Sequence, residues 1–134
     1  MRVNLCAAIL GVILLAAPAN AAGERVLVFG GQNHEEYLGC ISCSETAADS
    51  IWNRYSQYGW ENGFGKWNSF GKHKNQFSST SACNEFASKP PILVDAKGAI
   101  YGSLSVNAFA ARSVCGAVGV EQVCRALRAM CAST

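Results

Sequence analysis

Two cysteines separated by two residues, Cys40 and Cys43, are the first candidates for chemistry in this chain. At this spacing two thiols can form a reversible disulfide, and a helix beginning at the first thiol would lower its pKa. The residues between them are Ile41 and Ser42, whereas a thioredoxin-type site has glycine and proline there. A structural disulfide is therefore the main interpretation, and thiol–disulfide exchange by Cys40 and Cys43 is the enzymatic alternative.

Zinc binding is a second alternative for the same pair. Cys83 and Cys115 could complete a four-cysteine site, but only one half of it has the ligand spacing of a zinc motif. Because export favours oxidation of thiols, we expect neither a metal nor a cofactor. No paired carboxylates, serine nucleophile motif or phosphate-binding loop are recognisable, and His73, between Lys72 and Lys74, is expected to be exposed. The sequence thus favours a protein that is not an enzyme.

Aromatic residues recur with a regular spacing in the middle of the chain. The shared pattern is a small residue, any residue, Trp or Cys, Asn, any residue, an aromatic residue and a small residue. It occurs at 50–56, 65–71 and 81–87, with Cys83 replacing Trp in the third copy. The Trp and the aromatic residue are three apart, so on a helical turn they would face the same side. We therefore predict short helical turns, each held down by its aromatic pair and joined by glycine- and serine-rich loops.

The same aromatic residues are the candidate binding residues. Their rings could form a platform for the sugar rings of a glycan strand. The candidates are Trp52, Tyr55, Tyr58, Trp60, Trp67 and Phe70. Tyr58 and Trp60 lie outside the repeated pattern and are expected to be exposed. The alternative is that Trp52, Tyr55, Trp67 and Phe70 simply form the core.

The first residues of the chain indicate export. Met1 and Arg2 precede an apolar run, and Ala19-Asn20-Ala21 places small residues where signal peptidase reads them. We predict a signal peptide over 1–21 and one secreted or periplasmic domain over 22–134, with no membrane span after cleavage. Of the seven cysteines, Cys6 lies in the leader, so six remain. An even number in an oxidising compartment predicts three disulfides, with fifteen possible pairings.

Composition excludes other classes of protein. The chain has 134 residues, which fits one domain. Its formal net charge is +2, and losing Arg2 with the leader lowers this to about +1. Since the chain has no basic cluster, nucleic acid is not expected as a partner.

The elements around the candidate residues predict a small α+β domain with a short antiparallel sheet. Residues 25–31 (RVLVFGG) predict a strand, and 37–43 either a second strand or a turn before a helix. The repeats occupy about 49–89. After two prolines, 92–106 predicts a β-hairpin whose turn is Asp95-Ala96-Lys97-Gly98. Asn107 is placed to cap a short helix through Val114, and about 118–131 predicts a C-terminal helix.

The predicted C-terminal helix restricts the pairing of its cysteines. Its apolar face would carry Val120, Val123, Cys124, Leu127 and Cys131. Cys124 and Cys131 would lie about 10 Å apart by helical rise, too far for a disulfide. Cys115, across the glycine-containing bend, is then one partner. The other cysteine would reach Cys83 or the Cys40–Cys43 region, tying the helix to the repeats.

The segment from Tyr37 to Val106 resembles a family of small secreted bacterial proteins of uncharacterised function. Three motifs in order carry the resemblance: YLGCISC at 37–43, SIWNRY at 50–55 and PPILVDAKGAIYG at 90–102. The second repeat, beginning with Gly65-Lys66, and the third, with Cys83 for Trp, depart from the family pattern. The tail from Cys115 is an addition to the family pattern. The resemblance implies an accessory role beside other secreted domains and supplies no catalytic residue.

These observations predict a secreted, non-enzymatic binding or accessory module of the cell envelope or extracellular space. Its partner would be an envelope glycan or another secreted protein. The alternatives are a periplasmic thiol–disulfide protein that uses Cys40 and Cys43, and an inhibitor or toxin-like factor acting on another secreted protein.

Overall fold

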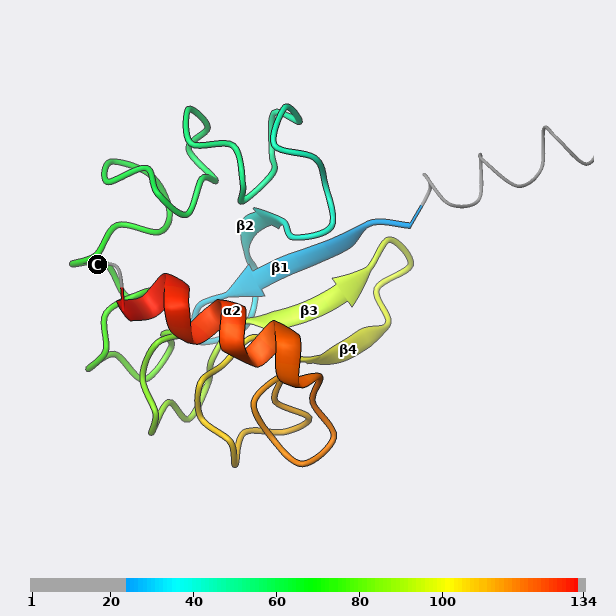
Figure 1. The fold of residues 1–134 in the computed structure, drawn as a ribbon, viewed down its shortest axis with the longest axis vertical. Helices are drawn as coiled ribbons and strands as arrows, with labels where there is room; N and C mark the ends of the chain where they lie inside the picture. Colours follow the sequence, from blue (N-terminus) through cyan, green and yellow to red (C-terminus); the bar gives the residue numbers. More distant parts are fainter. Residues whose placement is uncertain (1–23, 133–134) are drawn as a thin grey trace, which may run out of the picture.

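The fold is a four-stranded antiparallel sheet crossed by a C-terminal helix, seen in a computed structural model that describes residues 24–132 (Figure 1). The signal peptide predicted over 1–21 lies outside the described residues. The elements are β1 (Val26–Gly30), β2 (Glu36–Cys40), β3 (Ile92–Asp95), β4 (Ile100–Ser103) and α2 (Glu121–Ala132). The predicted α+β class is therefore confirmed, including the hairpin and the C-terminal helix.

The sheet brings together strands that are far apart in the sequence. Its strand order is β2-β1-β3-β4, and in the pairing of β1 with β3 Leu27 lies opposite Val94. The predicted hairpin turn joins β3 to β4: the Asp95 carbonyl accepts a hydrogen bond from the Gly98 N–H at 3.0 Å. The Asp95 carboxylate also accepts from the N–H groups of Lys97 and Ala99. Gly98 has φ +90°, a conformation that favours glycine.

Helix α2 lies across one face of the sheet (Figure 1) and contributes Leu127 to the core. Leu127 is buried with Val28 and Leu93 of the sheet, whereas Val120 is exposed. The prediction that Val120 lies on the buried face of the helix is wrong, because the helix begins only at Glu121. The Val120 carbonyl accepts from the N–H groups of Val123 and Cys124, so this residue stands at the N-cap of the helix.

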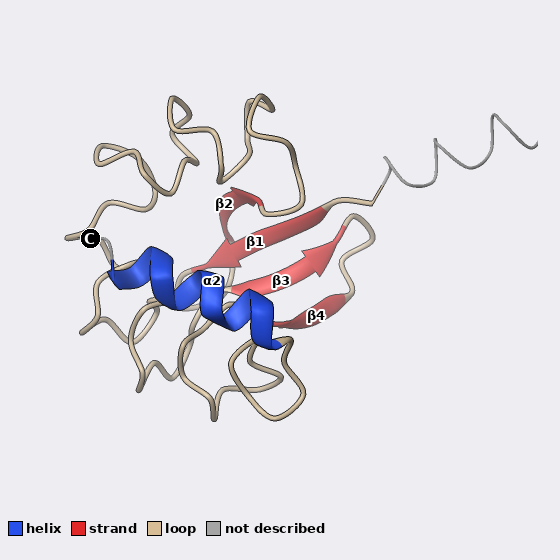
Figure 2. Cartoon of the chain, in the orientation of Figure 1, coloured by secondary structure: helices blue, strands red, loops and turns tan. Residues whose placement is uncertain are grey.

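The repeat region contains neither a helix nor a named strand, and Figure 2 shows it as loop. From residue 44 to residue 65 every third N–H donates to the carbonyl three residues earlier, so the end of one turn begins the next. The residues at these joints are Ser44, Ala47, Ser50, Asn53, Ser56, Gly59, Asn62 and Gly65. The prediction of helical turns is corrected to this chain of β-turns, which repeats every three residues.

Small residues at the joints allow successive turns to pack closely. A Cβ atom on Gly59 would lie 2.2 Å from the Asn53 carbonyl oxygen, and one on Gly65 would lie 2.3 Å from that of Gln57. Both separations are far shorter than a van der Waals contact. The glycine and serine content therefore reflects tight packing of turns.

The segment after β4 has the same organisation. Hydrogen bonds between residues three apart link Asn107, Ala110, Ser113, Gly116 and Gly119 in succession. The helix predicted from Asn107 through Val114 is therefore replaced by turns. Asn107 still begins the segment, and it accepts a bond from the Phe109 N–H at 3.0 Å.

Three disulfides connect the parts of the fold. Cys115 pairs with Cys124 (Cα–Cα 4.8 Å) and Cys83 with Cys131 (Cα–Cα 5.6 Å), so α2 is bound at both ends. The third bond joins Cys40 and Cys43. The prediction that Cys124 and Cys131 pair with Cys115 and a cysteine outside the helix is confirmed.

Candidate binding groove beside the tryptophans

Two of the candidate aromatic residues form the floor of the repeat region. Trp67 is 0% exposed and Trp60 is 3% exposed, with ring centroids 4.7 Å apart. The Trp67 indole N–H donates to the Leu38 carbonyl at 3.0 Å, and that of Trp60 donates to the Met130 carbonyl at 3.3 Å. The expectation that Trp60 is exposed is therefore wrong, because its ring joins the repeats to α2.

The other candidates differ in exposure. Tyr55 and Phe70 project into solvent, so the alternative that both belong to the core is wrong. Tyr58, also expected to be exposed, is instead half-buried, because its ring packs on that of Tyr37 of β2 with a centroid separation of 5.2 Å. Trp52 is 43% exposed and donates its indole N–H to the Ile41 carbonyl at 2.8 Å. Trp52 and Phe70 can therefore contact a ligand, whereas Trp67 can only support one.

Three of the candidates meet in one hollow, which we call the tryptophan hollow. It has a volume of about 540 Å³ and lies beside Trp52, Trp60 and Trp67. Its rim carries Arg54 and Glu61, exposed side chains that form an ion pair at 3.5 Å. An exposed pair of this kind contributes little to stability, so both groups are available to a polar ligand.

A second hollow, of about 590 Å³, shares Ser69 and Lys74 with the first. Phe70 and Phe77 line it, so we call it the phenylalanine hollow. Glu85 and Arg128 provide charges of both signs along its wall, and the end of α2 also contributes to it. The two hollows together are here called the groove. They adjoin at Ser69 and Lys74, and both present aromatic rings and hydrogen-bonding groups.

Lys74 stands where the two hollows meet. Its ammonium group donates to the Trp60 carbonyl at 3.0 Å and lies 4.8 Å from the centroid of the Trp60 ring. Burial lowers the pKa of Lys74, and the charge of Glu61 partly offsets this effect. The contact with the ring is a cation–π interaction, which holds the lysine against the groove floor.

The sequence interpretation missed a second set of aromatic residues that the turns display. Six Asn-x-aromatic units occur, and in each the Asn side-chain oxygen accepts the N–H of the aromatic residue at 2.8 to 3.0 Å. The aromatic residues are 82% to 100% exposed: Tyr55, Phe64, Phe70, Phe77, Phe86 and Phe109. The signal was present as the recurrence of Asn two residues before Phe or Tyr, which is typical of Asx turns.

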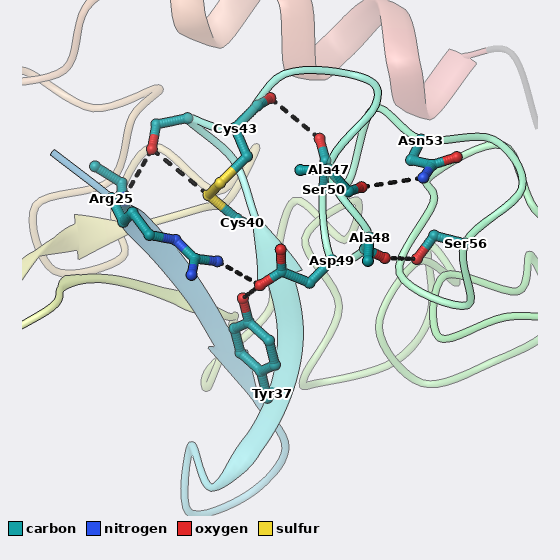
Figure 3. Close-up of polar contacts among 12 residues, drawn as sticks. Arg25, Tyr37, Cys40, Cys43, Ala47, Ala48, Asp49, Ser50, Asn53 and Ser56 are labelled. Carbon is teal, nitrogen blue, oxygen red and sulfur yellow. Dashed lines mark hydrogen bonds and ion pairs between the residues drawn. A yellow bond between two sulfur atoms is a disulfide. The ribbon is translucent and has the colours of Figure 1, made fainter. Parts of the chain in front are cut away.

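The Cys40–Cys43 disulfide lies at the end of β2 (Figure 3). Cys40 is fully covered, and Cys43 is half-buried. Within residues 24–132 no helix begins at Cys40, so the feature that would activate its thiol is not present there. The Ser50 hydroxyl donates to the Cys43 carbonyl at 3.1 Å, which ties the disulfide loop to the first turns.

A partly exposed polar cluster next to this loop links β1, β2 and the repeats. Figure 3 shows Arg25 and Tyr37 both reaching Asp49, and the Tyr37 hydroxyl donates to its carboxylate at 2.5 Å. This hydrogen bond and the Arg25 charge hold the pKa of Asp49 below its ordinary value. Burial and the Asp49 carboxylate raise the pKa of Tyr37, so its hydroxyl remains a donor. The cluster is a structural connection rather than an acid–base pair.

His73, expected to be exposed, is buried against Glu36 of β2. Its Nε2 atom lies 3.0 Å from a Glu36 carboxylate oxygen, but the geometry is not that of an aligned hydrogen bond. Burial lowers the pKa of His73. Burial also raises the pKa of Glu36, but the contacts with His73 and Lys72 outweigh this effect and leave it lowered. Lys66 and Lys72 lie 3.8 and 3.3 Å from the same carboxylate.

The zinc alternative does not agree with the cysteine pairing. Cys40, Cys43, Cys83 and Cys115 are distributed among three disulfides and are not free to act as thiolate ligands. Among the described residues, no group of three or more His, Cys, Asp or Glu side chains could hold a metal ion.

Comparisons with known proteins found no relative of this chain: no family model, curated protein or solved structure matches it. Residues 24–132 contain no helix that is long and apolar enough to cross a bilayer. The groove is therefore interpreted from its own chemistry.

Proposed function

We propose that the protein is an exported, non-enzymatic binding module that holds a glycan chain in the groove. The observation that carries this proposal is the set of exposed rings that line two adjoining hollows, Trp52 in one and Phe70 and Phe77 in the other. Sugar units have apolar C–H faces that can lie on aromatic rings, and hydroxyl groups that need hydrogen-bonding partners. The charged groups on the groove walls supply those partners.

The distribution of the exposed rings favours a glycan over a protein partner. None of the six exposed turn aromatics contacts another aromatic ring among the described residues. A protein interface has a contiguous apolar centre from which water is excluded. Separate rings among Asn, Ser and Lys residues instead suit a polymer of repeating polar units.

The presence of three disulfides supports the exported part of the proposal, since such bonds form and persist in oxidising compartments. Export would place the module with the polysaccharides of the envelope. An accessory role, tethering itself or a neighbouring domain to such a polymer, requires no catalytic group.

The experiment that tests the proposal measures binding to insoluble peptidoglycan and chitin by co-sedimentation. Phe70→Ala and Phe77→Ala each remove an exposed ring from the phenylalanine hollow without disturbing the core. We expect each to weaken binding about tenfold, because a lost aromatic contact is worth up to about 1.5 kcal/mol. Trp60→Ala is unsuitable, since it removes a buried ring.

The matched controls are Phe86→Ala and Phe109→Ala, which remove rings of similar exposure that line neither hollow. Both should bind like the unaltered protein. Equal losses in all four variants would show that exposed rings act as a nonspecific surface, and the groove would be rejected. Absence of binding to either polymer by the unaltered protein would reject these two glycans as ligands.

A further inference from the structure

We propose that an apolar pocket between α2 and the sheet binds the unbranched aliphatic chain of a small amphiphile. The pocket has a volume of about 410 Å³. Its walls come from three parts of the fold: Val26 and Leu93 of the sheet, Ile41 of the disulfide loop, and Val123, Ala126 and Leu127 of α2. Ile51, Trp52 and Met130 line both this pocket and the tryptophan hollow, but Val123, Ala126 and Leu127 line the pocket and not the hollow.

The chemistry of the walls selects an apolar occupant. Only Ser42 and Gln122 among the lining residues have polar side chains. The Ser42 hydroxyl is already engaged, because it accepts from the Val26 N–H at 2.8 Å and donates to the Glu24 carbonyl at 3.2 Å. A charged group inside would lose its hydration without gaining a partner. An aliphatic chain would therefore lie inside, with its polar head outside near Gln122.

The walls also restrict the shape of the occupant. Ile41 is fixed at both backbone groups, donating to the Val26 carbonyl at 2.9 Å and accepting from the Trp52 indole at 2.8 Å. The opposite wall, α2, is anchored by the Cys115–Cys124 and Cys83–Cys131 disulfides. Walls held in this way resist the separation that a helix of a partner protein would require. The volume lies within the range of small-molecule sites, so a slender chain is the occupant that fits.

Calorimetric titration of the oxidised, full-length mature protein with alkanoates from hexanoate to dodecanoate, below their micelle concentrations, tests this site. Affinity should rise about fourfold with each added methylene until the pocket is filled, and then level off. Absence of saturable binding, or an affinity that does not depend on the chain length of the alkanoate, would overturn the proposal.

Filling the pocket should abolish binding. Ala126→Phe places a ring inside it, and we expect at least a tenfold loss of alkanoate affinity, with an intermediate loss in Ala126→Leu. Ala129→Phe is the matched control, because Ala129 is exposed on the same helix, as Ala126 is, but does not line the pocket. Circular dichroism checks that α2 is intact in each variant. Equal losses in Ala126→Phe and Ala129→Phe would overturn the proposal.

Two further results distinguish an alkanoate site from other interpretations of the pocket. Phe77→Ala should weaken glycan binding but leave alkanoate affinity unchanged, since Phe77 lines the phenylalanine hollow and not the pocket. Failure of the alkanoate site can therefore be distinguished from failure of the glycan groove. A concentration-dependent dimer that disappears in Ala126→Phe would show that a second copy covers the pocket, and this would overturn the proposal.

Discussion

Trp67 and Phe70 are three residues apart, yet the first is 0% exposed and the second is 91% exposed. On a helix, residues at this spacing would share a face. Here Asn68 begins a turn between them: its side-chain oxygen accepts the Phe70 N–H at 2.9 Å, which directs Phe70 outward. The two rings therefore have different roles, one in the core and one on the surface of the groove.

Replacing these two residues should have very unequal effects on stability. Trp67→Phe leaves the buried Leu38 carbonyl without its donor and creates a cavity, so we expect a loss of about 2 to 4 kcal/mol. Phe70→Ala should change the free energy of unfolding by less than about 0.5 kcal/mol. Urea unfolding of both variants checks this, and comparable losses would contradict the described placement of the rings.

The side-chain amides of the turn asparagines should contribute unequally. Asn84 also donates from its Nδ2 atom to the Ser78 carbonyl at 2.9 Å, whereas for Asn75 only the accepting bond to the Phe77 N–H is observed. Asn84→Asp should therefore lose about 1 to 2 kcal/mol, because it removes the donor and retains the acceptor.

Asn75→Asp is the matched control and should be close to neutral. Thermal unfolding at neutral pH compares the two variants. Equal stability of Asn84→Asp and Asn75→Asp would show that the Nδ2 bond contributes nothing.

The Asp49 cluster should stabilise the fold above the ordinary carboxyl pKa. Since the Tyr37 hydroxyl and Arg25 lower the pKa of Asp49, its stabilising contribution is present above pH 3.8 and is lost as the pH falls further. Tyr37→Phe should reduce stability by about 1 to 2 kcal/mol at pH 7, and the difference should shrink in acid. Denaturation curves measured between pH 7 and about pH 3 test this. If the stability difference between Tyr37→Phe and the unaltered protein stays constant over that pH range, the stabilisation by the Tyr37 hydroxyl does not come from its hydrogen bond to Asp49.

His73 should make the fold less stable in mild acid. Because burial lowers the pKa of His73, the unfolded chain binds a proton more readily than the folded protein once the pH falls below 6.5. The free energy of unfolding should therefore decrease as the pH falls below this value. Glu36 affects the free energy of unfolding at lower pH. Because its own pKa is lowered, its stabilising contribution is lost as the pH falls below its ordinary pKa of 4.5.

The test is the slope of stability against pH between about 6.5 and 5. In His73→Gln this slope should be smaller than in the unaltered protein. An unchanged slope would assign the pH dependence to another group.

Removing the Cys83–Cys131 disulfide should lower the free energy of unfolding more than removing the Cys40–Cys43 disulfide. The Cys83–Cys131 bond closes a separation of 48 residues, and Cys40–Cys43 closes one of three. On a chain-entropy basis the first stabilises by about 4 kcal/mol and the second by about 2 kcal/mol. Urea unfolding of the two paired Cys→Ser variants measures this order.

Alkylation and peptide mapping at graded reducing potentials test the redox alternative directly. We expect the covered Cys40 to protect its bond, so that all three bonds resist reduction together. Selective opening of Cys40–Cys43 well before the other two would support thiol–disulfide exchange at this pair.

Several features of the fold could be predicted because local chemistry specifies them. Asp95 and Gly98 define the hairpin turn, and helical rise excludes a Cys124–Cys131 bond regardless of the rest of the fold. The repeated Trp-Asn-aromatic spacing was also visible, but its period was interpreted as helical. The true period of three follows from the hydrogen bonds that close each turn, and glycines such as Gly59 are needed by contacts with Asn53 that a linear pattern does not reveal.

The sequence by itself determined the α+β class, the hairpin and the constraint on the tail cysteines, because turn residues, strand periodicity and helical geometry act over a few residues. Only the tertiary structure decided which rings are buried. Burial depends on contacts between distant segments: Trp60 is covered because its indole reaches Met130 at the end of α2, 70 residues away. The same long-range contacts bring Trp52, Phe70 and Phe77 to one groove and enclose the apolar pocket beneath α2.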